Sequence, residues 1–234
     1  MSMQSRPRYW VVIPAAGMGT RMLSDVPKQY LKLGEKTVLE HTLSIFDSSL
    51  ESVQLVVCLA PNDDQFEQLI VSDKVMTALG GETRGETVLN GLCEIDADDS
   101  DWVIVHDAAR PCLSRDLLVH FVEQLSDDEV GGILAVPAKD TLKQASVDRK
   151  INQTIDRSMV WQAQTPQMFR YRLLRESLNA AINANATITD EASALEWAGY
   201  SPRLIEGEAR NIKVTTPDDL LFAEFLLETK GSTI

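Results

Sequence analysis

The fold of this chain is decided by residues 9–21, which are Tyr9-Trp10-Val11-Val12-Ile13-Pro14-Ala15-Ala16-Gly17-Met18-Gly19-Thr20-Arg21. A short apolar run without apolar/polar alternation is typical of a strand that is covered on both faces. The small residues after it allow backbone N–H groups to approach a phosphate closely. We therefore expect a buried strand followed by a phosphate-binding loop.

Similar apolar runs recur along the chain at residues 53–59, 102–105 and 132–136. Between them, apolar residues repeat at helical spacing over 39–50, 88–95 and 117–125. Strands that alternate with helices indicate a Rossmann-like α/β fold, with a mainly parallel sheet and helices on both faces. The length suits a single domain over residues 1–234.

Two later segments depart from this pattern. Residues 139–157 are polar, with strand-like pieces at 141–143 and 151–155, and predict a protruding β-arm inserted in the domain. Near the C-terminus, Thr216 and Pro217 predict the start of a helix, followed by two aspartates in its first turn. Leu221 with Phe225, and Phe222 with Leu226, are expected to supply the apolar contacts of that helix.

Composition excludes several classes of protein. The formal net charge of −13 argues against broad nucleic-acid binding, although a local group of cations can still bind a small anion. No run of 18 apolar residues predicts a membrane span, and no signal-like run opens the chain, so we expect a cytoplasmic protein. The three cysteines and three histidines show no metal-ligand spacing, and Cys58 is expected to be a buried free thiol.

The loop after the first strand fits neither common phosphate-binding motif. A dinucleotide-binding loop would need Gly or Ala where Met22 stands, which disfavours a nicotinamide-dependent dehydrogenase, and no Gly-Lys-Ser/Thr completes a P-loop. What remains is a glycine loop with Arg21 on it and Lys28 shortly after it. These cations either bind phosphate or are solvated charges around a tight turn.

Further blocks carry a resemblance to a known family. They are Pro14-Ala-Ala-Gly-x-Gly-x-Arg21, Pro27-Lys28-Gln-Tyr, Gly80-Gly81-Glu82-x-Arg84, 105–111 (Val-His-Asp-Ala-Ala-Arg-Pro), Asp140-Thr141, Asp156-Arg157, Thr165-Pro166-Gln167, 189–192 (Thr-Asp-Glu-Ala) and 211–214 (Asn-Ile-Lys-Val). In order and spacing the chain resembles the 2-C-methyl-D-erythritol 4-phosphate cytidylyltransferases. The resemblance implies the nucleotidyltransferase fold and the transfer of CMP from CTP to a polyol phosphate, with Mg²⁺ and release of pyrophosphate.

The resemblance also implies roles for individual residues. The catalytic set would be Arg21 and Lys28 on the triphosphate, with Arg157 and Lys213 on the polyol phosphate. The nucleotide would contact Pro14, Ala15, Ala16, Gly17, Gly81, Glu82, Thr87, Asp107 and Ala108. The substrate would contact Asp107, Arg110, Thr141, Arg157, Thr165, Thr189 and Lys213. Asp107 follows the 102–105 strand, where open α/β sheets place ligand-binding residues, and is also the candidate Mg²⁺ ligand.

Several alternatives stay open on the sequence alone. Arg110 either pairs with Asp107 or faces the polyol phosphate, Lys213 could be a surface charge, and His106 is expected to be structural. Glu82 and Thr87 stand where relatives often have Asp and Ser, and Arg210 where they often have an acidic residue. The rival functions are a cytidylyltransferase for another pentitol phosphate, such as ribitol 5-phosphate, and a non-catalytic nucleotide-binding subunit. By resemblance, the 139–157 arm crosses to a twofold-related subunit, which predicts a homodimer.

Overall fold

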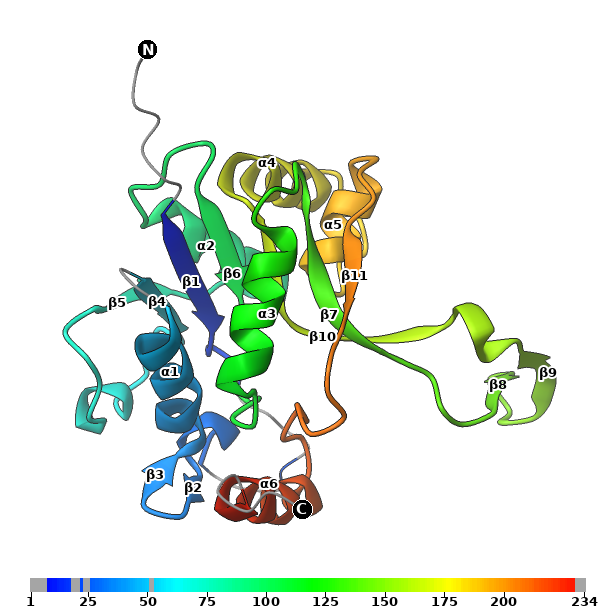
Figure 1. The fold of residues 1–234 in the computed structure, drawn as a ribbon, viewed down its shortest axis with the longest axis horizontal. Helices are drawn as coiled ribbons and strands as arrows, with labels where there is room; N and C mark the ends of the chain where they lie inside the picture. Colours follow the sequence, from blue (N-terminus) through cyan, green and yellow to red (C-terminus); the bar gives the residue numbers. More distant parts are fainter. Residues whose placement is uncertain (1–7, 18–21, 23–25, 51–52, 230–234) are drawn as a thin grey trace.

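A computed structural model describes residues 8–17, 22, 26–50 and 53–229. Its centre is a seven-stranded sheet with the order β11-β7-β10-β6-β1-β4-β5 (Figure 1). The strands are β1 (Tyr9–Pro14), β4 (Gln54–Leu59), β5 (Val75–Leu79), β6 (Trp102–Val105), β7 (Gly131–Pro137), β10 (Trp161–Arg170) and β11 (Arg203–Glu206). The four apolar runs therefore form strands as predicted.

Helices cover both faces of the sheet. Along β1, Val11 and Ile13 pack in one apolar cluster and Trp10 and Val12 in another, as the two-residue period of a strand requires. On the first face lie α1 (Val38–Ser49) and α3 (Arg115–Leu125). On the second lie α2 (Arg84–Cys93), α4 (Tyr171–Asn183) and α5 (Glu191–Trp197). The predicted α/β architecture is confirmed.

One central strand runs against the others. β10 is antiparallel to both β6 and β7, whereas the pairs of β1 with β4 and β6, β4 with β5, and β7 with β11 are parallel. The pairing of β10 with β7 shifts between Ala163 and Gln167, which leaves a bulge at residues 164–166. Bulges are frequent beside functional sites, because they redirect side chains that a regular strand would hold in its ladder.

The C-terminal helix α6 (Pro217–Glu228) begins as predicted. The Thr216 hydroxyl accepts a hydrogen bond from the amide of Asp219, whose side chain accepts one in return from the Thr216 amide. The expected apolar contacts are mostly wrong, because Leu221, Phe222 and Phe225 are 66%, 49% and 57% exposed. The buried face is centred on Ala223, with Leu220, Leu226 and Leu227 beside it in a third apolar cluster.

Short elements complete the described structure. β2 (Lys32–Leu33) pairs with β3 (Lys36–Thr37) near α6, and single turns of 3-10 helix lie at η2 (Lys28–Tyr30), η3 (Phe66–Gln68) and η4 (Arg157–Met159). None of the helices in the described ranges has the length and apolar content that crossing a bilayer requires.

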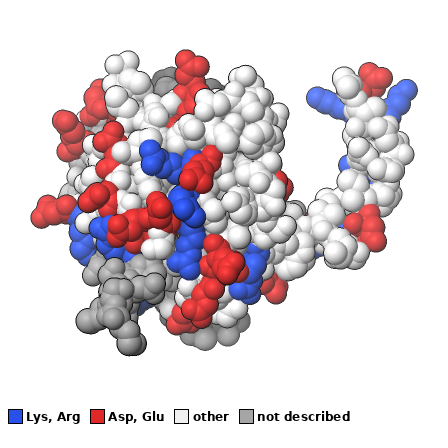
Figure 2. Space-filling view, turned by 90° about the horizontal axis from the view of Figure 1, so that it is seen from above, with Lys and Arg blue, Asp and Glu red and all other residues white. Residues whose placement is uncertain are grey.

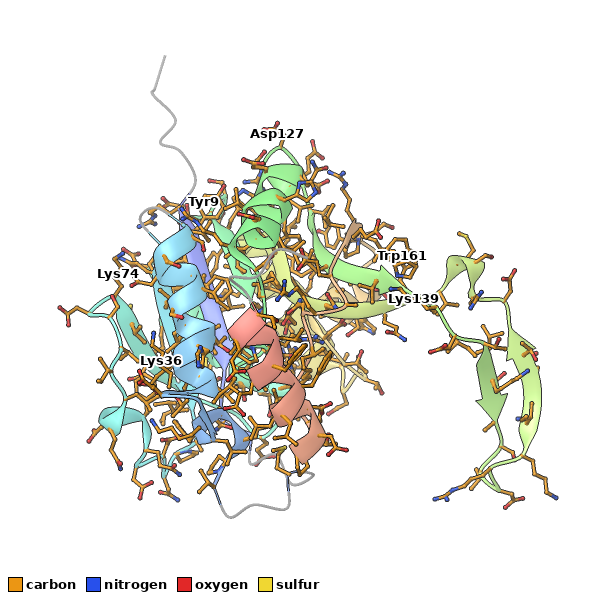
Figure 3. The ribbon with its side chains drawn as sticks, turned by 60° about the horizontal axis from the view of Figure 1, so that its bottom comes forward. Tyr9, Lys36, Lys74, Asp127, Lys139 and Trp161 are labelled. Atoms are coloured by element: carbon orange, nitrogen blue, oxygen red, sulfur yellow. The ribbon has the colours of Figure 1, made fainter. Side chains whose placement is uncertain are left out.

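The polar segment after β7 forms an antiparallel hairpin of β8 (Leu142–Ala145) and β9 (Ile151–Ile155). It projects from the main body in Figure 1, and in Figure 3 Lys139 and Trp161 lie where it joins that body. Every residue of β9 is exposed. On the face seen in Figure 2, acidic and basic side chains are interspersed over the body, and the hairpin carries both signs at its end.

Candidate functional site

A cavity opens at the carboxyl ends of β1 and β6, where ligands bind in open α/β sheets. Its walls come from the loops after β1 and β6, the start of α2, η2 and the segment before α6. It is lined by all nine residues predicted to contact the nucleotide: Pro14, Ala15, Ala16, Gly17, Gly81, Glu82, Thr87, Asp107 and Ala108. Lys28 and Lys213 line it as well.

Backbone contacts hold the floor of this first cavity. The Ala15 amide donates to the Cys58 carbonyl at 2.9 Å, and the Gln29 side-chain amide donates to the Ala15 carbonyl at 2.7 Å. A Cβ on Gly80 would lie 2.4 Å from the Ala16 Cβ, so only glycine lets the two loops approach this closely. The catalytic prediction for Arg21 falls outside the described residues.

The opposite wall is organised by Thr87. Its Oγ1 accepts a hydrogen bond from the Gly81 amide at 3.0 Å and donates to the Thr83 carbonyl at 2.8 Å. Thr83 in turn caps α2 through a reciprocal pair of hydrogen bonds with Glu86. Two of the predicted nucleotide contacts, Gly81 and Thr87, are therefore held together at the start of a capped helix.

Asp107 meets three cationic side chains. Its carboxylate lies 3.2 Å from Arg84 Nη2, 3.4 Å from Arg110 Nε and 2.8 Å from Lys213 Nζ. Burial alone would raise the pKa of the Asp107 carboxyl, but the charges of Arg84, Lys213 and Arg110 outweigh it and hold the pKa below its ordinary value. The pairing of Arg110 with Asp107, one of the two alternatives for this residue, is thus present.

Arg84 and Glu191 form an ion pair that the sequence reasoning missed. Arg84 Nη2 lies 3.0 Å from Glu191 Oε2, and Nη1 contacts the other oxygen, so the guanidinium binds both Glu191 and Asp107. Glu191 is fully buried, and burial raises the pKa of its carboxyl despite the neighbouring Arg84. Arg84 and Glu191 lie in the motif blocks at residues 80–84 and 189–192, and this position is the only sign of their importance that the sequence offers.

A second cavity lies on the other side of Asp107 and Arg84. Of the seven residues predicted to contact the polyol phosphate, it is lined by Asp107, Arg110, Thr165, Thr189 and Lys213. Arg84, Asp107 and Lys213 line both cavities and so form their shared wall. The remaining two, Thr141 and Arg157, belong to the projecting hairpin segment and line neither cavity within one chain.

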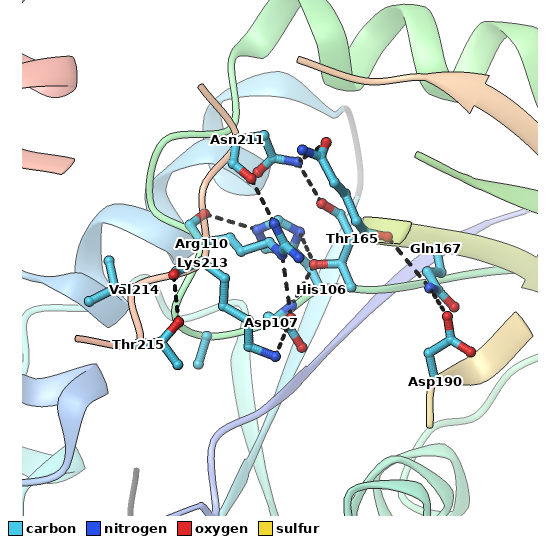
Figure 4. A network of polar contacts seen from close by, with 12 residues as sticks. His106, Asp107, Arg110, Thr165, Gln167, Asp190, Asn211, Lys213, Val214 and Thr215 are labelled. Atoms are coloured by element: carbon cyan, nitrogen blue, oxygen red, sulfur yellow. Dashed lines mark hydrogen bonds and ion pairs between the residues drawn. The ribbon is translucent and has the colours of Figure 1, made fainter. Parts of the chain in front are cut away.

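The segment before α6 is joined to the site by contacts of two lysines, Lys28 and Lys213. Lys28 Nζ donates to the carbonyl of Val214 at 3.0 Å. Lys213 is paired with Asp107, although its side chain stays 39% exposed (Figure 4). Arg210, whose effect on Lys213 was open, instead donates to the Leu226 carbonyl at 3.1 Å, in the last turn of α6. Of the four predicted catalytic residues, the structure brings Lys28 and Lys213 together.

His106 is buried behind this wall, as expected for a structural residue. Its Nδ1 lies 3.1 Å from Thr165 Oγ1 and its Nε2 lies 3.1 Å from the Arg110 carbonyl. Thr165 Oγ1 also accepts a hydrogen bond from the Asp107 amide at 3.0 Å. Burial lowers the pKa of the His106 imidazole to about 4, so the ring is neutral at pH 7.

Asp107, the predicted metal ligand, does not belong to a preformed metal-binding cluster among the described residues. No group of three His, Cys, Asp or Glu side chains that could hold a metal ion occurs in the described part of the chain. Cys58 is a buried free thiol, as predicted, and burial raises its pKa to about 12.

Comparison with known proteins gives one consistent result. Residues 9–229 match the family described as 2-C-methyl-D-erythritol 4-phosphate cytidylyltransferase. A protein of that name from Pseudomonas aeruginosa (strain UCBPP-PA14) is 52% identical over 226 residues, covering 94% of this chain and 97% of the relative.

Solved structures agree with the sequence match. A crystal structure of a 4-diphosphocytidyl-2C-methyl-D-erythritol synthase is 43% identical, with a TM-score of 0.83, and covers 96% of this chain and 100% of its own. The 2-C-methyl-D-erythritol 4-phosphate cytidylyltransferase of Francisella tularensis is 40% identical, with a TM-score of 0.82 and coverages of 94% and 99%. The chain therefore belongs to the 2-C-methyl-D-erythritol 4-phosphate cytidylyltransferase family.

Proposed function

We propose that this protein is a nucleotidyltransferase that moves the CMP part of CTP onto 2-C-methyl-D-erythritol 4-phosphate. The products are 4-diphosphocytidyl-2-C-methyl-D-erythritol and pyrophosphate. Besides the family, the observation that supports this most is the wall of Arg84, Asp107 and Lys213 between two cavities. Such a wall suits a reaction that joins a nucleotide on one side to a phosphate ester on the other.

The chemistry needs phosphate-binding cations more than a general base. A phosphate monoester is largely dianionic near pH 7, because its second pKa is about 6. One of its oxygens forms a bond to the α-phosphorus of CTP as the bond from that phosphorus to the bridging oxygen breaks, and the electron pair leaves with pyrophosphate. Two unit charges about 4 Å apart repel by roughly 4 kcal/mol at an effective dielectric near 20, so cations must offset this repulsion.

The described residues supply those cations. Four of them, Lys28, Arg84, Arg110 and Lys213, line the two cavities, against the three carboxylates of Glu82, Asp107 and Asp190. We assign Lys28, with Arg21, to the triphosphate, and Lys213 to the attacking phosphate. Asp107 keeps three of the cations in place before substrates arrive.

Mg²⁺ fits this site as an ion carried by the nucleotide. Mg²⁺ keeps several waters and is often held by one or two carboxylates together with substrate phosphates, without a cage of protein ligands. Asp107 at the shared wall is the carboxylate that would hold it, directly or through water. The ion would supply charge stabilisation on the α- and β-phosphate oxygens.

The projecting hairpin is proposed to complete a neighbour's site. Thr141 and Arg157 line neither cavity of their own chain, and the hairpin has too few apolar residues to form a core. A homodimer in which residues 139–157 cross to the partner would bring both residues to the polyol phosphate.

A cytoplasmic location also stays a prediction.

A pyrophosphate-release assay tests the proposed function. Purified protein is incubated with Mg²⁺, each of the four nucleoside triphosphates, and either 2-C-methyl-D-erythritol 4-phosphate or ribitol 5-phosphate. We expect turnover with CTP and the methylerythritol phosphate, and at least tenfold less with every other pair. Preference for ribitol 5-phosphate would establish the rival substrate, and CTP binding without turnover would indicate a non-catalytic subunit.

A further inference from the structure

Thr165 is held in place on two sides. It lies in the bulge of β10, is 4% exposed, and lines the second cavity. Its carbonyl accepts a hydrogen bond from the side-chain amide of buried Asn211 at 2.8 Å. With the backbone fixed in this way, what Thr165 can offer to a ligand depends on where its hydroxyl hydrogen points.

The neighbouring imidazole decides that direction. His106 Nε2 faces the Arg110 carbonyl, which can only accept, so Nε2 carries a hydrogen. The ring is completely buried, with its edge against Phe46 at a centroid distance of 5.3 Å. Among the described residues, no carboxylate contacts either ring nitrogen. An imidazolium would be a buried charge without a counter-ion in contact, so Nδ1 is a bare acceptor.

The hydrogen bonds of the Thr165 hydroxyl follow from this tautomer. The hydroxyl donates its one hydrogen to His106 Nδ1, and one of the two lone pairs on its oxygen accepts a hydrogen bond from the Asp107 amide (Figure 4). A single acceptor position is left. Phosphate oxygens at neutral pH are acceptors and cannot use it, whereas a hydroxyl group can donate to it.

We infer that His106 is a positioning residue whose unprotonated Nδ1 turns the Thr165 hydroxyl into a pure acceptor, so that Thr165 selects a substrate hydroxyl group rather than the substrate phosphate. The inference deepens the proposed function and rests on it, because the polyol supplies that hydroxyl. The phosphate end of the substrate is left to Lys213 and Arg110, which are donors only.

The tautomer can be measured without any substrate. Nitrogen-15 NMR of protein labelled at histidine, with the His106 signals identified by their loss in His106→Gln, should show a protonated Nε2 and a bare Nδ1 at pH 7. A protonated Nδ1 would overturn the inference. This outcome does not depend on catalysis, so it is distinguishable from a failure of the proposed function in the pyrophosphate assay.

Paired variants separate positioning from packing. Thr165→Val and His106→Gln should each raise the KM for the polyol phosphate about tenfold, the size of one lost hydrogen bond, with the KM for CTP changed less than twofold. Asparagine can place an oxygen near the Nδ1 position, so His106→Asn should recover most of that loss. His120→Gln, on α3, is the control. Equal rises in both KM values, or no recovery by asparagine, would contradict positioning.

Two further measurements complete the test. Because His106 acts through Thr165, adding His106→Gln to Thr165→Val should raise the KM less than twofold further, and a full second tenfold rise would refute the link. Inorganic phosphate, used as a competitive inhibitor, should bind wild type and Thr165→Val equally well. A weaker inhibition of Thr165→Val, matching its change in KM, would show that Thr165 contacts phosphate instead.

Discussion

Asp107 has the contacts expected of a carboxylate that holds cationic side chains in position for an anionic ligand. A side chain that is only 9% exposed pairs with Arg84, Arg110 and Lys213, and each of these cations also faces a cavity. Cations fixed before binding need little reorganisation when charge develops in the transition state. Arg84 is held most firmly, because buried Glu191 binds it from the other side.

The two lysines at the site should fail in different ways. Lys28→Met should lower kcat about 100-fold or more with little change in KM, since its charge acts on the triphosphate in the transition state. Lys213→Met should raise the KM for the polyol phosphate about tenfold or more and leave CTP affinity nearly unchanged. Steady-state kinetics with each substrate varied measures both. Exposed Lys36→Met is the control, and the reverse pattern would mean that the two halves of the site are exchanged.

Asp107→Asn should reveal the charge of the carboxylate in a pH series. At pH 7 we expect the free energy of unfolding to fall by about 3 kcal/mol, because three cations lose their buried partner. The folded pKa of Asp107 is depressed, so its contribution is complete above the unfolded value of about 3.9 and is lost as pH falls further. Urea unfolding in EDTA measures the difference in unfolding free energy between wild type and variant, and this difference should become smaller from pH 5 to pH 3. A difference that does not change with pH would show that the charge of Asp107 is not responsible.

The hydrophobic pattern of the sequence predicted the strands that are buried on both faces. It did not predict strands whose buried residues are polar or whose residues are largely exposed. β1, β4, β6 and β7 stood out as continuous apolar runs. β10 did not, because its buried half contains the polar residues Gln164, Thr165 and Gln167, whose hydrogen-bond partners come from distant segments: the Glu208 carbonyl and the side chains of His106 and Asp190, respectively. The edge strands β5 and β11 are largely exposed and carry no such run.

Helix α2 packs on the sheet at a point that tolerates no added atom. A Cβ on Gly91 would lie 2.6 Å from Cys58 Sγ and 3.0 Å from Val12 Cγ1. Gly91→Ala should therefore cost about 2 kcal/mol of unfolding free energy, as overpacked cores do. Cys58→Ala should recover at least half of that cost in the double variant. Gly85→Ala, in the same helix with its nearest atoms at 3.8 Å, is the matched control for urea unfolding.

The same two cavities explain which site residues the sequence could predict. The motif blocks contain most of the residues of both linings, because several of these blocks follow a strand or start a helix at the carboxyl ends of the strands. Arg84 and Glu191 were missed because their pairing joins residues 107 positions apart, which no local pattern reports. Thr141 and Arg157 cannot be placed at a site by one chain at all, since they belong to the projecting hairpin segment (Figure 1).

If that hairpin completes the partner's site, two inactive variants should complement each other. Lys28→Met disables the body of a subunit, and Arg157→Met disables only what its hairpin gives to the neighbour. In a mixed dimer, one site then has both defects and the other has neither. Equal amounts of the two proteins, dissociated and reassembled at random, put half of the chains in mixed dimers and should restore about a quarter of wild-type activity, while each protein alone stays inactive.

The reassembled mixture also separates the alternatives. A hairpin that serves its own chain would leave every site with one defect, so mixing would restore nothing. Sedimentation must first show a dimer at micromolar concentration, because a fully active monomer would refute the crossing directly. Lys28→Met mixed with Lys213→Met, assayed at a polyol phosphate concentration far below the KM, provides the control. Both changes lie in the body, so each site of a mixed dimer keeps one of them, and mixing should give no more than the mean of the two separate activities. Activity recovered in the first mixture and not in the second requires that one active site be built from two chains.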